Sequence, residues 1–291
     1  MRTLLTLALL ALCACEPKST GGGGGAGGRL AFVRSGNVWV VDDDGVTGEL
    51  AVTTAGVESE PALSPNGQSV VYTHEAGGGG SEIWRTSVTG GVPARVSLAS
   101  VGGSRDEAAS WSPDGAKLVY GESTTGGASS LLLANTDGSG NPTPLTSPTP
   151  ASFPVFSKDA TLVLAVFNAG LGTVPVAGSG QLTPLQPAGL GQVLSRAVYS
   201  PDGARIAFSL KPAGGAHPKV FVMNADGSMP RQLTGTPDGD DVWPAWSFDG
   251  SFVAFQSNAG GSDNIYAETV DTPGEPKLLV GDAKTPSWSV K

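Results

Sequence analysis

Three acidic residues share one position in a repeated sequence pattern, and they are the strongest candidates for chemistry in this chain. Glu58, Asp106 and Asp241 each stand five residues before the apolar or aromatic residue that opens a recurring turn motif. If the repeats are equivalent in space, the three carboxylates gather around one end of a common axis. Such an acidic mouth would suit a basic peptide or a cation. The alternative is that the three carboxylates are solvent-exposed loop residues that bind no ligand.

Further polar and aromatic residues fall in the same loops and complete a predicted binding face. Varied loops bind ligands more often than the elements they connect. Trp243 stands out because it is out of register with Trp111, Trp246 and Trp288, which recur at one position and are expected to pack between repeats. The predicted binding face consists of Glu58, Glu60, Asp106, Glu107, Arg196, Asp240, Asp241 and Trp243.

Signatures of known catalytic machinery are absent from the sequence. There is no Gly-x-Ser-x-Gly nucleophile elbow, and the turn motif differs from the Ser-x-Asp-x-Gly box of sialidases. His74 and His217 are the two histidines, and neither has a second histidine or a cysteine nearby, which argues against a zinc site. We therefore predict no catalytic residue, no metal and no cofactor. An active site assembled from scattered loop residues stays open.

The composition narrows the class of protein. The 291 residues include 17 Lys and Arg against 26 Asp and Glu, a formal charge of −9. A phosphate backbone needs basic residues to neutralise it, so nucleic acid is a poor partner. The chain has 43 glycines and 22 prolines, below the share that indicates disorder. No apolar stretch reaches the roughly 20 residues of a membrane-spanning helix.

The candidate residues belong to a chain that repeats from Arg29 onward. An apolar or aromatic residue is followed by Ser-Pro-Asp-Gly or a close variant, and successive marker serines are 43 to 48 residues apart. Proline presets the second position of a type I turn, Asp suits the third, and Gly leads into the next strand. Short β-forming runs follow each motif. The marker serines are Ser64, Ser112, Ser157, Ser200 and Ser247.

This period predicts a circular fold. Four short strands in about 40–45 residues are typical of a propeller blade. The first repeat lacks the strand with the motif, whereas Thr285 to Ser289 is such a strand with no repeat after it. We therefore expect an all-β, six-bladed β-propeller with four-stranded blades, closed by the C-terminal strand joining the N-terminal blade. Closure removes exposed sheet edges. An open two-sheet sandwich is the alternative.

The repeats resemble those of the TolB-like propeller family over residues 29–291, on motifs such as Ser112-Pro113-Asp114-Gly115. The resemblance implies a propeller of the cell envelope. Similar repeats also form the gating propellers of prolyl-oligopeptidase-type enzymes. The family's periplasmic protein is soluble and has an α/β domain before its propeller, whereas a glycine-rich segment stands there in this chain. A role in the Tol–Pal envelope system therefore rests on analogy.

The first 28 residues predict where the protein is located in the cell. Residues 1–14 combine one positive charge with a short apolar run, as in a signal peptide. The run Leu-Cys-Ala before Cys15 resembles the lipobox of bacterial lipoproteins, which implies that Cys15 becomes the lipidated first residue. Residues 15–28 then form a flexible Gly-rich tether. Glu16 in place of Asp favours the outer membrane if the cell has two membranes. An ordinary secretory signal is the alternative.

Together these patterns predict a lipid-anchored, monomeric propeller of the cell envelope that docks a protein or peptide. Its contact with the membrane is expected through the lipid alone, and the family resemblance implies a part in envelope integrity. One alternative is a propeller enzyme, a hydrolase or lyase, that acts on envelope glycans or peptides. A structural envelope protein without a specific ligand is the other.

Overall fold

The fold is described by a computed structural model over residues 28–42, 48–98, 103–127, 129–146, 150–178, 180–185, 189–235 and 238–289. Within these ranges the chain forms 25 β-strands, one short 3-10 turn at Gly77–Gly79, and no α-helix. The described residues contain no helix that could span a bilayer. The predicted signal peptide, Cys15 and nearly all of the predicted tether lie outside these ranges.

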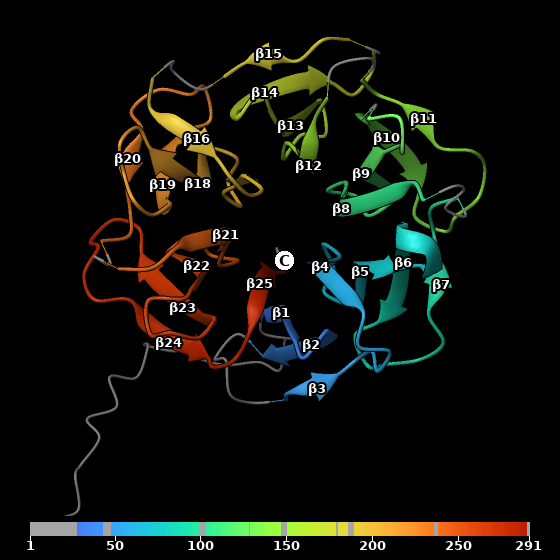
Figure 1. The fold of residues 1–291 in the computed structure, drawn as a ribbon, viewed down its shortest axis with the longest axis horizontal. Coiled ribbons are helices and arrows are strands. Elements are labelled where there is room, and N and C mark those ends of the chain that lie inside the picture. Colours follow the sequence, from blue (N-terminus) through green and yellow to red (C-terminus); the bar gives the residue numbers. More distant parts are fainter. Residues whose placement is uncertain are drawn as a thin grey trace, which may run out of the picture.

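The strands form a wheel of antiparallel sheets around a central axis (Figure 1). Each sheet runs from an inner strand near the axis to a short outer strand at the rim. Hydrogen bonding groups the strands into five sheets.

The first sheet joins the two ends of the described chain. Its order is β25-β1-β2-β3, and Leu30 on β1 lies opposite Trp288 on β25 in an antiparallel pair. The Ser289 main-chain N donates to Arg29 O at 2.9 Å, and Arg29 N donates to Ser289 Oγ at 2.9 Å. The expected pairing between the last strand and the first is present. The strands are β1 (Arg29–Arg34), β2 (Asn37–Asp42), β3 (Leu50–Ala51) and β25 (Lys284–Trp288).

The second sheet has eight strands because one bridge joins two antiparallel sets of four. A single parallel pair, Ser81 opposite Arg105, links β6 to β8, and Ser81 Oγ donates to Asp106 O at 3.1 Å. The sheets therefore number five, whereas the sequence predicts six separate ones. The first set is β4 (Glu58–Leu63), β5 (Ser69–Glu75), β6 (Ser81–Ser87) and β7 (Ala94–Arg95). The second set is β8 (Arg105–Trp111), β9 (Lys117–Ser123), β10 (Ser129–Asn135) and β11 (Thr143–Pro144).

Three further sheets complete the wheel. The third is β12 (Ser152–Phe156), β13 (Leu162–Phe167), β14 (Gly170–Pro175) and β15 (Thr183–Pro184). The fourth has a divided inner edge and contains β16 (Gly191–Val193), β17 (Val198–Tyr199), β18 (Arg205–Pro212), β19 (Lys219–Asn224) and β20 (Arg231–Gln232). The fifth is β21 (Asp241–Trp246), β22 (Phe252–Ser257), β23 (Asn264–Thr269) and β24 (Lys277–Val280).

The core lies between neighbouring sets of strands. The second strand outward from the axis is buried on both faces, so it is a continuous apolar run, as Leu118, Val119 and Tyr120 of β9 show. The described residues form six apolar clusters, each drawn from two neighbouring sets. One of them packs Phe32 of β1 against Ala254 of β22. Each set is therefore stabilised by both of its neighbours.

The repeated motif builds one type of hydrogen-bonded turn. Ser112 Oγ donates to Asp114 Oδ1 at 2.5 Å and accepts from Lys117 N at 2.9 Å, while Asp114 Oδ1 accepts from Ala116 N at 3.0 Å. The hydrogen bond from Ser112 lowers the pKa of Asp114. Matching bonds occur at Ser64, Ser157, Ser200 and Ser247. We call the end of the wheel with these turns the turn face, and the end where the inner strands begin the loop face.

A second turn type yields a first prediction about stability. Gly138 and Gly227 occupy the same position of two Asp-Gly-Ser turns, with φ of 74° and 86°. A Cβ would lie 3.2 Å from Arg95 O at Gly138 but 2.2 Å from Leu185 O at Gly227. Alanine in left-handed backbone costs about 1 kcal/mol. We expect Gly227→Ala to cost about 1–3 kcal/mol more than Gly138→Ala, because only the former overlaps a neighbouring carbonyl.

Urea unfolding of the two variants measures this difference. Equal midpoints would show that the carbonyl of Leu185 moves aside freely.

Candidate functional site

A cavity of about 370 Å³ runs along the axis of the wheel. It is lined by residues of the inner strands, of which β4, β8, β12, β21 and β25 surround the centre in Figure 1. The lining extends from Glu60 and Arg196 to Pro113 and Lys158 at the turn face, so the cavity follows the inner strands along their length. Its aromatic lining residues are Trp111, Phe153, Phe156, Tyr199, Trp243, Trp246 and Trp288. The volume is at the lower end of the range for ligand pockets.

One repeated position supplies a different side chain to the axis from each repeat. It lies four residues before the serine of the turn motif. The six residues at this position, which we call the channel ring, are Glu60, Ala108, Phe153, Arg196, Trp243 and Thr285. All but Thr285 line the cavity.

The backbone at the channel ring is left-handed in every copy except Arg196. The φ values of the other five lie between 46° and 57°. Non-glycine residues adopt this region rarely, at a cost of about 1–2 kcal/mol each. The inner strands also shift register there, as between Ser59 and Ala62 on β4. Each shift is a β-bulge, which inserts one extra residue and interrupts the regular alternation of side chains along the strand. Strained backbone of this kind concentrates at functional sites.

The sequence patterns did not predict the ring as a unit, although the predicted binding face includes three of its members. A signal exists in the sequence: proline follows the ring residue in four of the six copies, at Pro61, Pro154, Pro244 and Pro286. The residue before proline is held away from helical backbone, which marks an irregular point in a strand.

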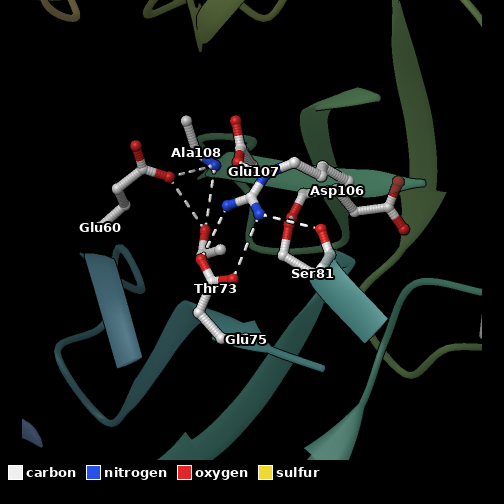
Figure 2. A network of polar contacts seen from close by, with 9 residues as sticks. Glu60, Thr73, Glu75, Ser81, Asp106, Glu107 and Ala108 are labelled. Carbon is white, nitrogen blue, oxygen red and sulfur yellow. Dashed lines mark hydrogen bonds and ion pairs between the residues drawn. The ribbon is translucent and has the colours of Figure 1, made fainter. Parts of the chain in front are cut away.

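Glu60 is fixed from two neighbouring strands. Its Oε2 accepts from Thr73 Oγ1 of β5 at 3.0 Å and from Ala108 N of β8 at 2.8 Å (Figure 2). Burial raises the pKa of Glu60, and the hydrogen bond from Thr73 opposes that rise. The carboxyl group is therefore a positioned part of the cavity wall.

Arg196 crosses the axis from its own repeat to the far wall. It lies between β16 and β17, and its guanidinium donates from Nη1 to Pro61 O at 3.5 Å and from Nη2 to Pro286 O. Trp243 lies against it, with the ring centroid 5.9 Å from Cζ, and Phe153 packs edge-on against Trp243 at 5.3 Å. Burial lowers the pKa of Arg196 to about 10, and the charge of Glu60 opposes this. The guanidinium keeps its positive charge at neutral pH and narrows the channel at the level of the ring.

The three repeated carboxylates are not gathered around the axis. Glu58, Asp106 and Asp241 are 5%, 5% and 0% exposed, and none lines the cavity. Asp241 accepts from Ser257 Oγ at 2.7 Å and pairs with Lys219 Nζ at 3.3 Å. The register shift comes shortly after each of these carboxylates. The ring residues, two positions later in the sequence, therefore reach the axis, while the carboxylates stay between the strands. The expected acidic mouth is therefore not formed.

Two more residues of the predicted binding face lie away from the cavity. Glu107 Oε1 accepts from Arg105 Nε at 2.5 Å (Figure 2), and Asp240 Oδ1 lies 2.8 Å from His217 Nδ1. Both carboxylates are part-exposed, so a role in binding remains a prediction for them. His74 belongs to β5.

No group of three His, Cys, Asp or Glu side chains that could hold a metal ion occurs in the part of the chain that the structure describes.

The wheel of radiating antiparallel sheets around an axial cavity defines an all-β protein with a β-propeller arrangement. Its fold is TolB-like. TolB from Acinetobacter baumannii matches with a TM-score of 0.73 at 20% identity, over 91% of this chain and 67% of that one. A TolB candidate from Agrobacterium tumefaciens matches with a TM-score of 0.66 at 19% identity, over 88% of this chain and 89% of that one. A chain in a nidogen/laminin complex matches with a TM-score of 0.71 at 12% identity, over 91% of this chain and 99% of that one.

Comparison at the level of sequence is much weaker. No protein-family model matches the chain. A stretch of 102 residues is 30% identical to dipeptidyl-peptidase 5 of Porphyromonas gingivalis and covers 30% of this chain but 15% of the peptidase. At such low identities the solved structures establish a shared fold and nothing about a shared ligand.

Proposed function

We propose that this chain is a lipid-anchored propeller of the cell envelope that binds a protein or peptide in its axial cavity. It acts as a binding module and not as an enzyme. The channel ring is the observation that supports this. The turn motif repeats the same serine because the scaffold needs it, whereas the ring holds six different residue types at one position. Varied side chains on a strained, repeated position favour recognition of a ligand.

We also propose that the propeller has six blades. The two halves of the eight-stranded sheet count as two blades, since one bridge joins them. The pairing of β25 with β1 and the apolar cluster between β1 and β22 support closure by the C-terminal strand. A closed wheel hides its inner sheet edges, which favours a monomer.

The lining of the cavity favours a peptide as ligand. Seven aromatic residues and four prolines line the cavity, and grooves with such side chains accept extended peptide segments. The nidogen/laminin structure is itself a complex of proteins, which supports a protein partner for a wheel of this shape. Of the eight residues of the predicted binding face, Glu60, Arg196 and Trp243 line the cavity, and we place binding there.

Site-specific photocrosslinking in intact cells tests this function. A photoreactive phenylalanine at position 243, inside the cavity, should capture a discrete protein or peptide partner. The same residue at Leu278, which is 52% exposed on the outer strand β24, is the matched control and should capture nothing specific. Capture at Leu278 alone, or equal capture at both positions, would remove the cavity as the binding site.

The anchor has its own test, because Cys15 lies outside the described residues. We expect the full chain to pellet with membranes and to enter the detergent-rich phase, and Cys15→Ser to become soluble or to stay as precursor. In a cell with two membranes we expect the protein in the outer membrane, and Glu16→Asp should move it to the inner one. An unchanged fractionation of Cys15→Ser would contradict lipidation.

A propeller enzyme acting on envelope peptides or glycans is the second candidate function. The local similarity to a dipeptidyl-peptidase is the observation that favours it. We expect no turnover when the purified full chain is incubated with chromogenic dipeptide substrates or envelope glycans. Turnover that Glu60→Gln abolishes would replace the binding function with an enzymatic one.

A further inference from the structure

The axial cavity is more basic than the chain that forms it. Its charged lining residues are Glu60, Lys158 and Arg196, two cations and one carboxyl group in a chain of formal charge −9. Glu60 Oε2 already accepts two hydrogen bonds. Burial also raises the pKa of Glu60, because the ionised carboxylate is poorly solvated there. This local balance favours an anionic ligand.

Two residues that line the cavity, Arg196 and Trp288, each have a hydrogen-bond donor that finds no partner among the described residues. Arg196 Nε and Trp288 Nε1 are buried and make no hydrogen bond. A buried donor without a partner is unfavourable, so a ligand oxygen that accepts a hydrogen bond from it gains affinity. Arg196 is linked to the strand of Trp288, because its Nη2 donates to Pro286 O on β25.

The tryptophans at the equivalent position of two other repeats use their indole N–H in a hydrogen bond. Trp111 Nε1 donates to Ala62 O at 2.9 Å, and Trp246 Nε1 donates to Val198 O at 3.1 Å. Each of these bonds joins one repeat to the one before it. Trp288 stands at the same position of its repeat, one residue before the serine, but its Nε1 has no partner.

The course of the channel indicates how a ligand lies in it. Strands surround the cavity on all sides, and Arg196 crosses the axis at the level of the ring. A chain that enters past the exposed Lys158 and Pro113 of the turn face therefore ends at Arg196 and does not pass through the wheel. This geometry accepts a chain terminus more readily than an internal acidic residue, whose chain would have to continue in both directions.

We propose that the axial cavity binds the carboxyl terminus of a partner peptide, with Arg196 as the anchor for the terminal carboxylate. Trp288 Nε1 donates to a second oxygen of the same ligand, and the aromatic wall contacts an apolar last side chain. The inference rests on the proposed function and adds the chemical group that is recognised.

A pool of N-acetylated tripeptides, prepared as free acids and as C-terminal amides, serves as probe. The pool is passed over the immobilised full chain, and mass spectrometry measures retention. We expect the free acids to be retained at least about tenfold better than the amides, because a charge-assisted bond to guanidinium is lost in the amide. Arg196→Gln should abolish that preference. Arg95→Gln, on the outer strand β7 and outside the cavity, should leave it unchanged.

A matched pair of tryptophan variants separates binding from folding. Trp288→Phe keeps the ring and removes an N–H that bonds nothing, so melting should not change while retention of the acids falls about three- to tenfold. Trp246→Phe removes an N–H that bonds Val198 O, so it should melt earlier and keep its preference for acids. The pair supplies an answer even if Arg196→Gln does not fold.

Three outcomes would overturn the inference. One is equal retention of acids and amides, a second is retention of neither, and the third is displacement of the acids by inorganic phosphate at equal concentration, which indicates a general anion site. If position 243 still captures a partner in cells while acids and amides bind alike, the proposed function stands and the carboxylate anchor falls.

Discussion

Removal of residues 284–291 is expected to unfold the protein or turn it into an aggregate. The deletion takes away β25, the antiparallel partner of β1, together with Trp288, which packs against the cluster of Leu30 and Phe32. Loss of a buried aromatic residue costs about 3–5 kcal/mol and each lost hydrogen bond about 1 kcal/mol. A total of about 5 kcal/mol or more approaches the whole stability of an ordinary domain. The edge of β1 would also be free to pair with another chain.

Thermal melting and size-exclusion chromatography measure this effect. We expect the melting temperature to fall by about 10–20 °C, or the transition to disappear. Deletion of residues 290–291 alone leaves β25 intact and is the matched control. A synthetic peptide of residues 283–291 should restore part of the lost stability by pairing with β1. A shortened chain that melts as before and stays monodisperse would show that the fold does not depend on the pairing of β25 with β1.

Asp106→Asn is expected to stabilise the protein, which is unusual for a buried polar residue. Asp106 is 5% exposed, and its Oδ1 has no hydrogen-bond partner among the residues that the structure describes. Burial raises the pKa of Asp106 to about 7, helped by Glu122, Glu82 and Glu107 and opposed by a hydrogen bond with Ser97. An ionised carboxylate in this place is therefore unfavourable, and an amide of the same shape carries no charge.

The pH dependence follows from the proton balance. In the unfolded chain Asp106 ionises near 3.8, whereas the folded protein holds the proton up to about pH 7. Unfolding then releases a proton between about pH 4 and 7, so stability falls as pH rises through this window, and the full cost applies above it. Three pKa units correspond to about 4 kcal/mol, so Asp106→Asn should gain about 2–4 kcal/mol at pH 8 and nothing at pH 4.

Asp241→Asn is the control, because it changes a buried carboxylate at the equivalent position of another repeat. Asp241 accepts from Ser257 Oγ and pairs with Lys219, so its replacement should destabilise the fold by on the order of 3 kcal/mol at neutral pH. Urea unfolding of both variants between pH 4 and pH 8 checks the opposite signs. If Asp106→Asn keeps the pH dependence of the native protein, the proposed titration is wrong.

The local sequence determined much of the fold. The turn motif could be read because its bonds join residues within a few positions, as Ser112, Asp114 and Lys117 show. The apolar runs predicted the buried second strands because sheets on both sides leave no polar face. The pairing of β25 with β1 was foreseeable because a strand missing from one end of the repeats was present at the other.

The candidate site could be predicted only in part. Glu60, Arg196 and Trp243 were chosen from the sequence and do line the cavity. The same reasoning chose Asp106 and Asp241, which are buried between strands. A count of residues along a strand assumes regular alternation, and the left-handed residue in the inner strand breaks that alternation.

The sequence by itself determined which segments become strands and turns and which two ends meet, since these depend on residue type and on contacts close along the chain. The tertiary structure alone decided which residues face the axis. It placed Arg196 against Pro61 and Pro286, 135 and 90 residues away in the chain. It also left Trp288 Nε1 without the bond that Trp111 and Trp246 make. Such long-range placements depend on register shifts and on packing across the whole wheel, which no local pattern encodes.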